Sequence, residues 1–227
     1  MIIAIDGPAG SGKSSTTKIV AAKLGIMYLD TGAMYRAVTL KALRLNIHYS
    51  DDNALDGMMR DTVIAFKGIP PDVRIIMDGE DVSVAVRTDE VTKNVADYCA
   101  SYNIRKSLVD QQRNFAVGRS LVCEGRDIST VVFPKAEIKI FMSASLKERA
   151  KRRQKDFAAM GISKSIEELM REMAIRDQSD LTRSNGPLIK VDDAIDMDTT
   201  GMTFNEQTEF IVEKVKSVMM GTALKFV

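Results

Sequence analysis

The sequence predicts an α/β protein with three layers, α/β/α, built on a central parallel sheet, with a small antiparallel insertion and a short helical lid. Apolar, strand-like runs alternate with helical patterns near the start of the chain, two β-rich runs later follow one another directly, and residues 145–177 combine dense charge with helical spacing. The 227 residues suit a single domain over 1–227, with the insertion over about 62–88 and the lid over about 148–163.

The first elements alternate between strand and helix. Residues 2–5 (IIAI) form a short continuous apolar run, which is typical of a buried parallel strand. Residues 13–24 place apolar side chains at helical spacing and are followed by Gly25, a residue type that commonly ends helices. Residues 26–30 (IMYLD) are again strand-like, and residues 31–46 are helical. This alternation favours parallel strands connected by helices.

The middle of the chain departs from this alternation. Residues 62–66 and 73–77 are both β-rich, and only a stretch with a glycine and two prolines separates them. The pair Asp78-Gly79 follows as a turn signal. Because no helix lies between the two runs, they are expected to pair antiparallel, as an insertion into the α/β domain.

The later elements return to the first pattern. Their strand segments are short and largely apolar, and the charge-dense helical segments have the composition of solvated helices. They are expected as a helix over 89–117, strands over 120–125 and 136–144, two helices divided by Gly161 within 145–177, a strand over 193–198 and a closing helix over 204–220.

Composition narrows the possible functions. The formal net charge is +1, which argues against a protein that binds nucleic acid or a membrane surface through bulk charge. The two cysteines have no metal-ligand spacing, and a single histidine gives little support to histidine triads or multi-histidine metal sites. No apolar stretch approaches the roughly 20 residues of a membrane span. We expect a cytoplasmic monomer with small-molecule partners, without nucleic acid or membrane.

The first strand ends at a glycine-rich loop, GPAGSGKS, which matches the phosphate-loop (P-loop) pattern G-x-x-x-x-G-K-[ST] in full. Glycines let successive backbone N–H groups point at phosphate oxygens, and the following helix presents its N-terminus to the same anion. Lys13 adds charge for the outer phosphates, and the Ser14 hydroxyl is placed to ligate Mg²⁺. The expected nucleotide-binding residues are Gly7, Pro8, Ala9, Gly10, Ser11, Gly12, Lys13, Ser14 and Ser15.

Arginines in later loops indicate a second substrate. The sequence has no N-K-x-D motif of the kind that reads guanine in GTPases, and it is short for a motor or transport ATPase. Phosphoryl transfer needs positive charge around the transferred group while water is excluded, and arginine binds phosphate bidentately. Many loop arginines beside a P-loop therefore favour a kinase whose acceptor is itself a phosphorylated small molecule.

Further motifs carry a specific resemblance. DTGAMYRAVT (30–39), DGEDVS (78–83), EGRDISTVVFP (124–134), ERAKRR (148–153) and RDQSDLTRSNGPL (176–188) resemble, in this order, the motifs of the bacterial cytidylate kinase family. The resemblance runs from Ile3 to about Asp198. It implies a P-loop nucleoside monophosphate kinase in which the insertion binds nucleotide. It also implies transfer of the γ-phosphoryl group of ATP, with Mg²⁺ as cofactor, to CMP or dCMP.

The same resemblance implies roles for individual residues. Asp127 would accept from the cytosine amino group, Arg105 would donate to the acceptor edge of the base, and Asp180 would bind the ribose hydroxyls. The implied acceptor-binding set is Thr31, Arg36, Arg105, Arg126, Asp127, Arg176, Asp180 and Arg183. The implied catalytic set is Lys13, Arg126, Arg153 and Arg176.

Several alternatives remain open from the sequence. Ala96 stands where the family often has a serine, which removes one base contact and weakens the expectation of strict cytosine selection. Arg149 or Arg153 is expected to close over the phosphates, with at least one lid arginine facing solvent. Asp6 could orient the loop, contact the metal through water or be purely structural. The alternative functions are a kinase for UMP, AMP or another small molecule, and a nucleotide-binding switch with no acceptor.

Overall fold

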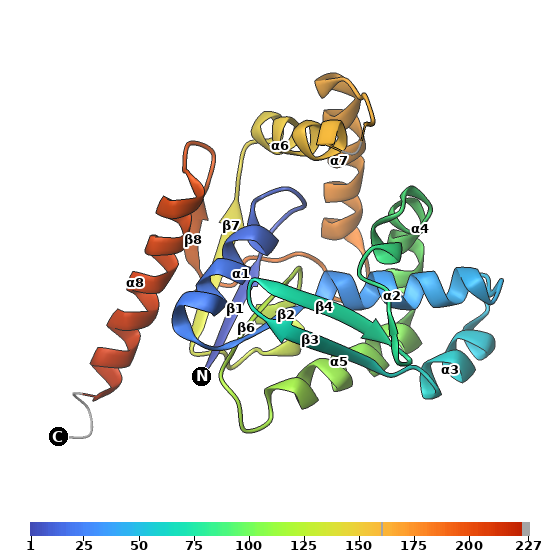
Figure 1. Cartoon of the computed structure of the whole chain (residues 1–227), viewed down its shortest axis with the longest axis horizontal. Helices are drawn as coiled ribbons and strands as arrows, with labels where there is room; N and C mark the ends of the chain where they lie inside the picture. The colour runs from blue at the N-terminus through green and yellow to red at the C-terminus, as the bar shows by residue number, and fades with distance from the viewer. Residues whose placement is uncertain (160, 224–227) are drawn as a thin grey trace.

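The computed structural model describes residues 1–159 and 161–223. Its central sheet has five strands, all paired in parallel (Figure 1). In spatial order they are β2 (Met27–Asp30), β6 (Leu121–Gly125), β1 (Ile2–Asp6), β7 (Ile138–Ser143) and β8 (Ile195–Asp198). The parallel sheet predicted from the apolar runs is confirmed, with each strand within about two residues of its expected position at either end.

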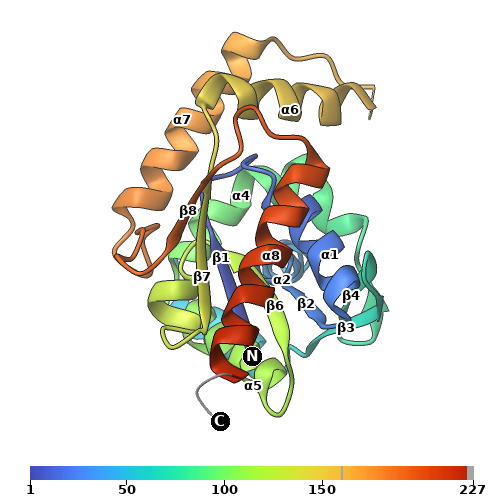
Figure 2. The same cartoon turned by 90° about the vertical axis from the view of Figure 1, so that its left-hand side faces the viewer.

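Helices cover both faces of the sheet, and the alternation of side chains along each strand decides which layer they meet. The covering helices are α1 (Lys13–Leu24), α2 (Thr31–Arg44), α5 (Tyr102–Ala116) and α8 (Phe204–Ala223). Ile3 and Ile5 of β1 lie in a core with Val20 of α1 and Ile211 of α8, and Figure 2 shows these two helices side by side over that face. Ala4 contacts the opposite core, so the three predicted layers are present.

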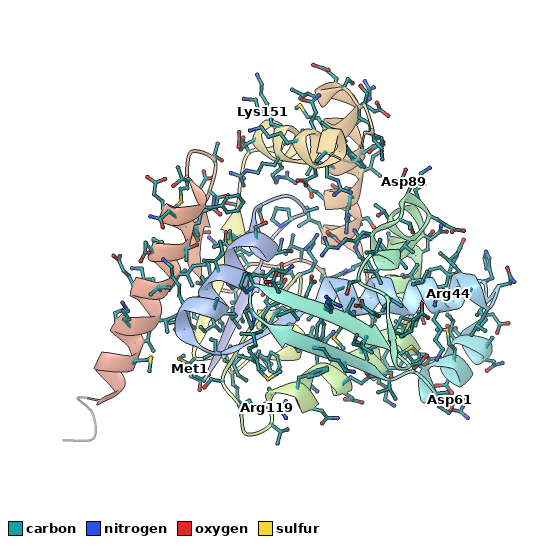
Figure 3. The ribbon with its side chains drawn as sticks, in the orientation of Figure 1. Met1, Arg44, Asp61, Asp89, Arg119 and Lys151 are labelled. Carbon is teal, nitrogen blue, oxygen red and sulfur yellow. The ribbon has the colours of Figure 1, made fainter. Side chains whose placement is uncertain are left out.

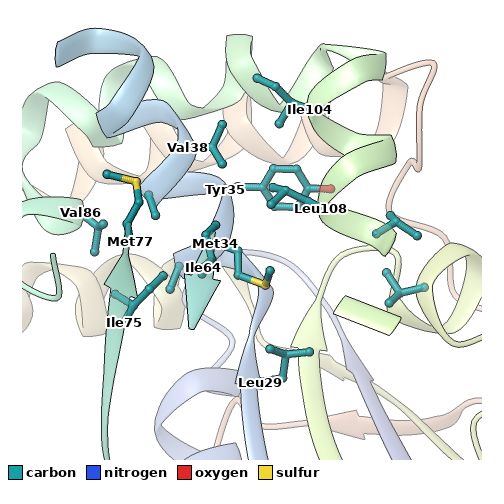
Figure 4. Close-up of a cluster of buried hydrophobic side chains, with 14 of the residues drawn as sticks. Leu29, Met34, Tyr35, Val38, Ile64, Ile75, Met77, Val86, Ile104 and Leu108 are labelled. Atoms are coloured by element: carbon teal, nitrogen blue, oxygen red, sulfur yellow. The ribbon is translucent and has the colours of Figure 1, made fainter. Parts of the chain in front are cut away.

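The larger core lies on the α2 and α5 side of the sheet (Figure 4). Leu29 of β2 and Met34 of α2 are buried there with Ile104 and Leu108 of α5. Ile75, from the antiparallel insertion, belongs to the same cluster. Burying an aliphatic side chain of this size stabilises the fold by roughly 1.5–3 kcal/mol. The shared core therefore attaches the insertion to the parallel-sheet domain.

The insertion is a small antiparallel sheet. Its strands are β3 (Ile64–Ile69), β4 (Asp72–Met77) and β5 (Glu80–Asp81), in that order. The predicted turn lies between β4 and β5, where both Asp78 and Gly79 have positive φ. β3 starts two residues later than the predicted run because Thr62 closes the preceding helix, donating from Oγ1 to Met58 O at 2.6 Å.

Two helices next to the insertion differ from the expected pattern. The preceding one, α3 (Asp52–Arg60), was not predicted, although Asp51 caps it by accepting from Ala54 N at 3.0 Å. The helix predicted over 89–117 is broken at Ser101, which has an extended conformation (φ −62°, ψ 125°). The break separates α4 (Asp89–Ala100) from α5. It lets Tyr98 and Ile104 both reach the larger core, so burial overrides local helix continuity.

The charge-dense region forms two stacked helices above the ends of the strands (Figures 1 and 2). α6 (Leu146–Ala159) and α7 (Ile166–Thr182) separate near Gly161, as predicted, and residue 160 of the predicted lid lies outside the described residues. They have a small core of their own around Phe157 and Leu169. Within residues 1–159 and 161–223, the structure contains no helix long and apolar enough to cross a membrane.

Candidate active site

The candidate site lies at the carboxyl ends of the parallel strands. The loop of residues 7–12 follows β1, Thr31 follows β2, and Arg126 and Asp127 follow β6. Parallel strands end at one edge of the sheet, so these segments meet there although they are far apart in sequence. The Thr31 hydroxyl donates to Glu124 O at 2.7 Å and joins the ends of β2 and β6.

The glycine-rich loop is built as a phosphate cradle. Gly7 has φ +152°, and a Cβ there would lie closer than 3.0 Å to the Met142 carbonyl oxygen of β7, so the loop packs against the neighbouring strand without room for a side chain. Gly12 adopts a left-handed conformation directly before α1, whose first turn has no acidic residue. The free N–H groups at this helix start are therefore available to an anion.

Lys13 is buried beneath the loop. Its Nζ donates to Gly7 O and Pro8 O, each at 2.7 Å, and to Ser11 Oγ at 3.2 Å. Burial, followed by the nearby Arg126, lowers the pKa of Lys13 below its usual range. The loop thus folds around its own lysine, and phosphate oxygens could replace the carbonyl oxygens that now accept from the ammonium group.

Ser14 lies where a divalent cation could be held. It is exposed on the first turn of α1, beside Tyr28 and Glu124. The Tyr28 hydroxyl donates to the buried Glu124 carboxylate, whose pKa is raised by burial and then by the nearby Asp30. No group of three or more His, Cys, Asp or Glu side chains suited to a metal occurs among the described residues. This arrangement fits Mg²⁺, which is usually bound by one or two protein groups together with substrate phosphates and water.

Glu124 and Tyr28 were not singled out from the sequence. The acidic residue at the end of the apolar run LVCEG is a usable signal, because buried acids are rare unless they pair or bind a cation. Tyr28 has no comparable signal in the sequence. Asp6 has a different role: its carboxylate accepts from Ile128 N and Ser129 N, both at 2.8 Å, at the start of the helical turn η2 (Ile128–Val132). Of the three readings left open for Asp6, these contacts favour the structural one.

Arginines converge beside the loop. Burial and then the nearby Arg176 and Arg153 lower the pKa of Arg36 to about 10. Burial and then Arg126 lower the pKa of Arg176. Arg36 is held by a hydrogen bond from Nη1 to Thr92 Oγ1 at 2.9 Å. Guanidinium groups that lie this close repel one another. A phosphate bound among them would relieve the repulsion and accept their hydrogen bonds.

The carboxylate of Asp180 connects two further arginines. Arg126 donates from Nε to Asp180 Oδ2 at 2.7 Å, and Arg183 Nη1 lies 3.6 Å from Asp180 Oδ1. Arg183 also donates from Nε to Gly186 O at 2.6 Å. Arg176 and Asp180 lie in α7 and Arg183 directly follows it, so the charges of the three side chains interact near the end of this helix.

Arg105 and Asp127 form a buried ion pair, with about 6% of each side chain exposed. The Arg105 guanidinium carbon lies 5.6 Å from the centre of the Tyr35 ring. Arg105 Nη1 is buried without a hydrogen-bond partner. A buried donor without a partner is costly, and a ligand that accepts from it would remove that cost. Ala96 is exposed on α4.

The lid arginines have three different environments. Arg149 is buried and donates to Ala144 O at 3.0 Å and to Ala9 O of the glycine-rich loop at 3.2 Å, whereas Lys151 points outward on α6 (Figure 3). Arg152 donates from Nη2 to Thr199 O at 2.7 Å. Arg153 lies 4.4 Å from the centre of the Phe157 ring. Arg149 is buried, whereas Arg152, with 24% of its side chain exposed, and Arg153 are both partly accessible to solvent.

Known proteins are similar to this chain in sequence or in fold. The family model described as cytidylate kinase matches residues 3–217. A cytidylate kinase of Lysinibacillus sphaericus (strain C3-41) is 44% identical, covering 96% of this chain and 97% of its own length. One from Listeria monocytogenes serovar 1/2a is 47% identical over 90% of this chain and 91% of its own. A crystal structure of an uncharacterized protein from Eubacterium ventriosum has a TM-score of 0.50 at 14% identity, covers 96% of this chain and 99% of its own, and shows likeness of fold only.

Proposed function

The chain belongs to the cytidylate kinase family, and from that membership we propose that it transfers the γ-phosphoryl group of ATP to CMP or dCMP, giving ADP and CDP or dCDP. One observation supports this most strongly. The glycine-rich loop follows β1, and Arg126 and Asp127 follow the neighbouring parallel strand β6, with Arg105 of α5 paired to Asp127. A donor site and an acceptor site are thereby combined.

The donor side would work through residues 7–15. Backbone N–H groups of the loop and of the first turn of α1 would hold the phosphates, and Lys13 would turn from the carbonyls of Gly7 and Pro8 to phosphate oxygens. Ser14 would hold Mg²⁺, with Glu124 nearby. Bound Mg²⁺ supplies positive charge that neutralises oxygens of the donor phosphates during transfer.

The acceptor phosphate would lie among Arg36, Arg126 and Arg176, with Arg153 approaching from the lid. These side chains would position the acceptor oxygen in line with the γ-phosphorus and offset the charge of two phosphates brought together. A general base is unnecessary because a phosphate monoester has a second pKa of about 6 and is already ionised at neutral pH. Helices α6 and α7 would exclude water from the transfer.

The base and sugar would be read on the other side of the acceptor site. Asp127 would accept from the cytosine amino group, and Arg105 would donate from Nη1 and Nη2 to the acceptor edge of the base. Asp180 and Arg183 would contact the ribose hydroxyls. Uracil presents a carbonyl in place of the amino group, so Asp127 would disfavour UMP. A cytoplasmic, monomeric enzyme stays the prediction made from the sequence.

ADP formation from ATP and Mg²⁺ with CMP, dCMP, UMP and AMP in turn tests the proposal. Rapid turnover with CMP and dCMP alone is expected, and it would show that an alanine at position 96 is compatible with cytosine selection. Equal turnover with UMP or AMP would favour the broader small-molecule kinase. Saturable ATP binding without acceptor-stimulated ADP release would favour the nucleotide-binding switch.

A further inference from the structure

A close contact joins Gly186 to the Arg105–Asp127 pair. Gly186 has φ +61°, and a Cβ built there would lie closer than 3.0 Å to Arg105 Nη2, Arg105 Cζ and Asp127 Oδ2. These atoms include the donor and the acceptor that the two side chains present to each other. The backbone at Gly186 therefore lies against the polar ends of the buried pair, and a methyl group there would displace them from their present positions.

The segment that carries Gly186, residues 184–187, is fixed at several points. Arg183 donates to Gly186 O at 2.6 Å, and Asn185 Nδ2 donates to Ala100 O at 3.4 Å, beside the break between α4 and α5. After the segment, Leu188 N donates to Asp180 O at 2.8 Å and the Leu188 side chain is buried. Residues 184–187 therefore connect the end of α7 to the α4–α5 break across the ion pair.

We propose that Gly186 is a specificity-determining position of the acceptor site. The inference rests on the proposed function, in which Arg105 and Asp127 read the base. To do so, each must turn its polar end from the other toward the base edge, and the covering segment (residues 184–187) bounds the space in which they turn. A methyl group at position 186 would occupy that space and screen the atoms that distinguish cytosine from uracil.

Asp127 follows β6, Arg105 lies in α5, and Gly186 follows α7. The close approach of three separate elements makes the position sensitive to size. The donor site uses residues 7–15, and the Lys13 ammonium group donates its hydrogen bonds to that loop. Added bulk at position 186 is therefore expected to weaken acceptor binding and base discrimination and to leave ATP binding unchanged.

The test compares Gly186→Ala and Gly186→Asn with Gly118→Ala. Asparagine tolerates positive φ better than alanine does, so the two substitutions at position 186 add the same Cβ with different backbone strain. Gly118 has φ +69° with nothing within 4 Å of a built Cβ, so Gly118→Ala adds backbone strain without crowding. For each purified variant, CMP, UMP and ATP affinities are measured by calorimetry, with melting temperature as a folding control.

Both substitutions at position 186 are expected to weaken CMP binding by about tenfold or more. The added side chain would obstruct the charged hydrogen bonds that Arg105 and Asp127 make to the base. They should narrow the preference for CMP over UMP, and Gly118→Ala should do neither. Normal CMP affinity in Gly186→Asn would overturn the inference, because strain and not crowding would then explain Gly186→Ala. Equal loss of ATP affinity would also overturn it. If wild-type protein binds ATP but not CMP, the proposed function itself fails.

Discussion

Arg126 and Asp180 are 54 residues apart in the chain and are joined by a hydrogen bond of 2.7 Å from Nε to Oδ2. The pair links the carboxyl end of β6 to the last turns of α7. The same contact therefore ties the helices above the site to the parallel sheet and orients an arginine that we assign to the acceptor phosphate.

Replacing Asp180 by alanine is expected to reduce both stability and acceptor binding. Arg126 would lose its partner in a mostly buried position, at a cost of about 1–3 kcal/mol in the free energy of unfolding. If Asp180 also binds ribose hydroxyls, the variant should lose CMP affinity more than dCMP affinity. Urea unfolding and KM for the two acceptors measure these effects. Unchanged stability would show that the ion pair contributes nothing measurable.

The stabilising effect of Asp180 should depend on pH. Burial by itself would raise the pKa of Asp180, but Arg126, Arg176 and Arg183 together outweigh burial and the pKa lies below the usual 3.8. A carboxylate with a lowered folded-state pKa stabilises the fold above its unfolded pKa and loses that contribution as pH falls through the folded value. The stability difference between wild type and Asp180→Ala should therefore be constant near neutrality and shrink below about pH 4. A difference that grows on acidification would contradict the assignment.

Asp127→Asn tests the reading of the base. An amide keeps the shape of the carboxylate but can donate a hydrogen bond, which suits the carbonyl of uracil as well as the amino group of cytosine. The preference for CMP over UMP, measured as the ratio of kcat/KM values, should fall by about tenfold or more. ATP affinity should stay unchanged. A retained preference would mean that cytosine is selected by other groups.

Lys13→Met tests the donor site. Methionine keeps most of the length of the lysine side chain but not its charge, and Gly7 O and Pro8 O lose a donor while the cost of burying the ammonium group is removed. The larger loss should be catalytic, with kcat lower by about 10²–10³ because phosphate charge is no longer offset. Steady-state kinetics at saturating ATP measure it. A kcat within tenfold of wild type would remove Lys13 from the catalytic set.

Much of the fold could be predicted because short apolar runs and helical patterns are local properties of the chain. The order of strands and helices around β1 depends on such runs, and the structure confirms it. The break at Ser101 could not be predicted in this way, since Tyr98 and Ile104 on its two sides become buried only when the larger core forms. Tertiary burial, and not local propensity, decides where that helix ends.

The candidate site also has one part that a local sequence pattern predicts and another that depends on the folded structure. The glycine-rich loop is continuous in sequence, so its sequence pattern is enough to predict phosphate binding. The acceptor residues are spread over α2, α5, the segment after β6, and the end of α7, and only the family resemblance brought them together before the structure was known. The burial of Arg149 under Ala9 and the contact of Gly186 with the Arg105–Asp127 pair depend on side-chain directions that no local pattern specifies.

The thiol of Cys99 should react slowly at neutral pH. Its burial raises its pKa to about 11, against the influence of the nearby Arg183 and Arg105. At pH 8 the thiolate fraction, and hence the alkylation rate, should be about a hundredfold below that of an ordinary thiol. The rate should rise about tenfold per pH unit up to at least pH 9.5. Iodoacetamide labelling of a Cys123→Ser variant measures it, and a plateau near pH 9 would contradict the raised pKa.

The two lid arginines named as alternatives should separate into a structural and a catalytic residue. Arg149 contacts Ala144 O, Ala9 O and Asp177, so Arg149→Met leaves several buried groups unpaired and should cost about 2–4 kcal/mol in stability. Arg153→Met loses the guanidinium contact with the Phe157 ring, worth about 0.5–1 kcal/mol, and the charge near Arg36. The melting temperature of Arg153→Met should therefore stay close to wild type.

The turnover numbers of Arg149→Met and Arg153→Met distinguish the catalytic arginine from the structural one. Arg153→Met should lower kcat by about 10–100-fold, because a charge that approaches the phosphates is missing. Arg149→Met should mainly lower the melting temperature, by roughly 2–4 °C for each kcal/mol lost. Both quantities are measured on both variants at a temperature where each is folded. A stable Arg149→Met with the larger loss of kcat would reverse the assignment, because the arginine beneath Ala9 would then be the one that acts on the transferred group.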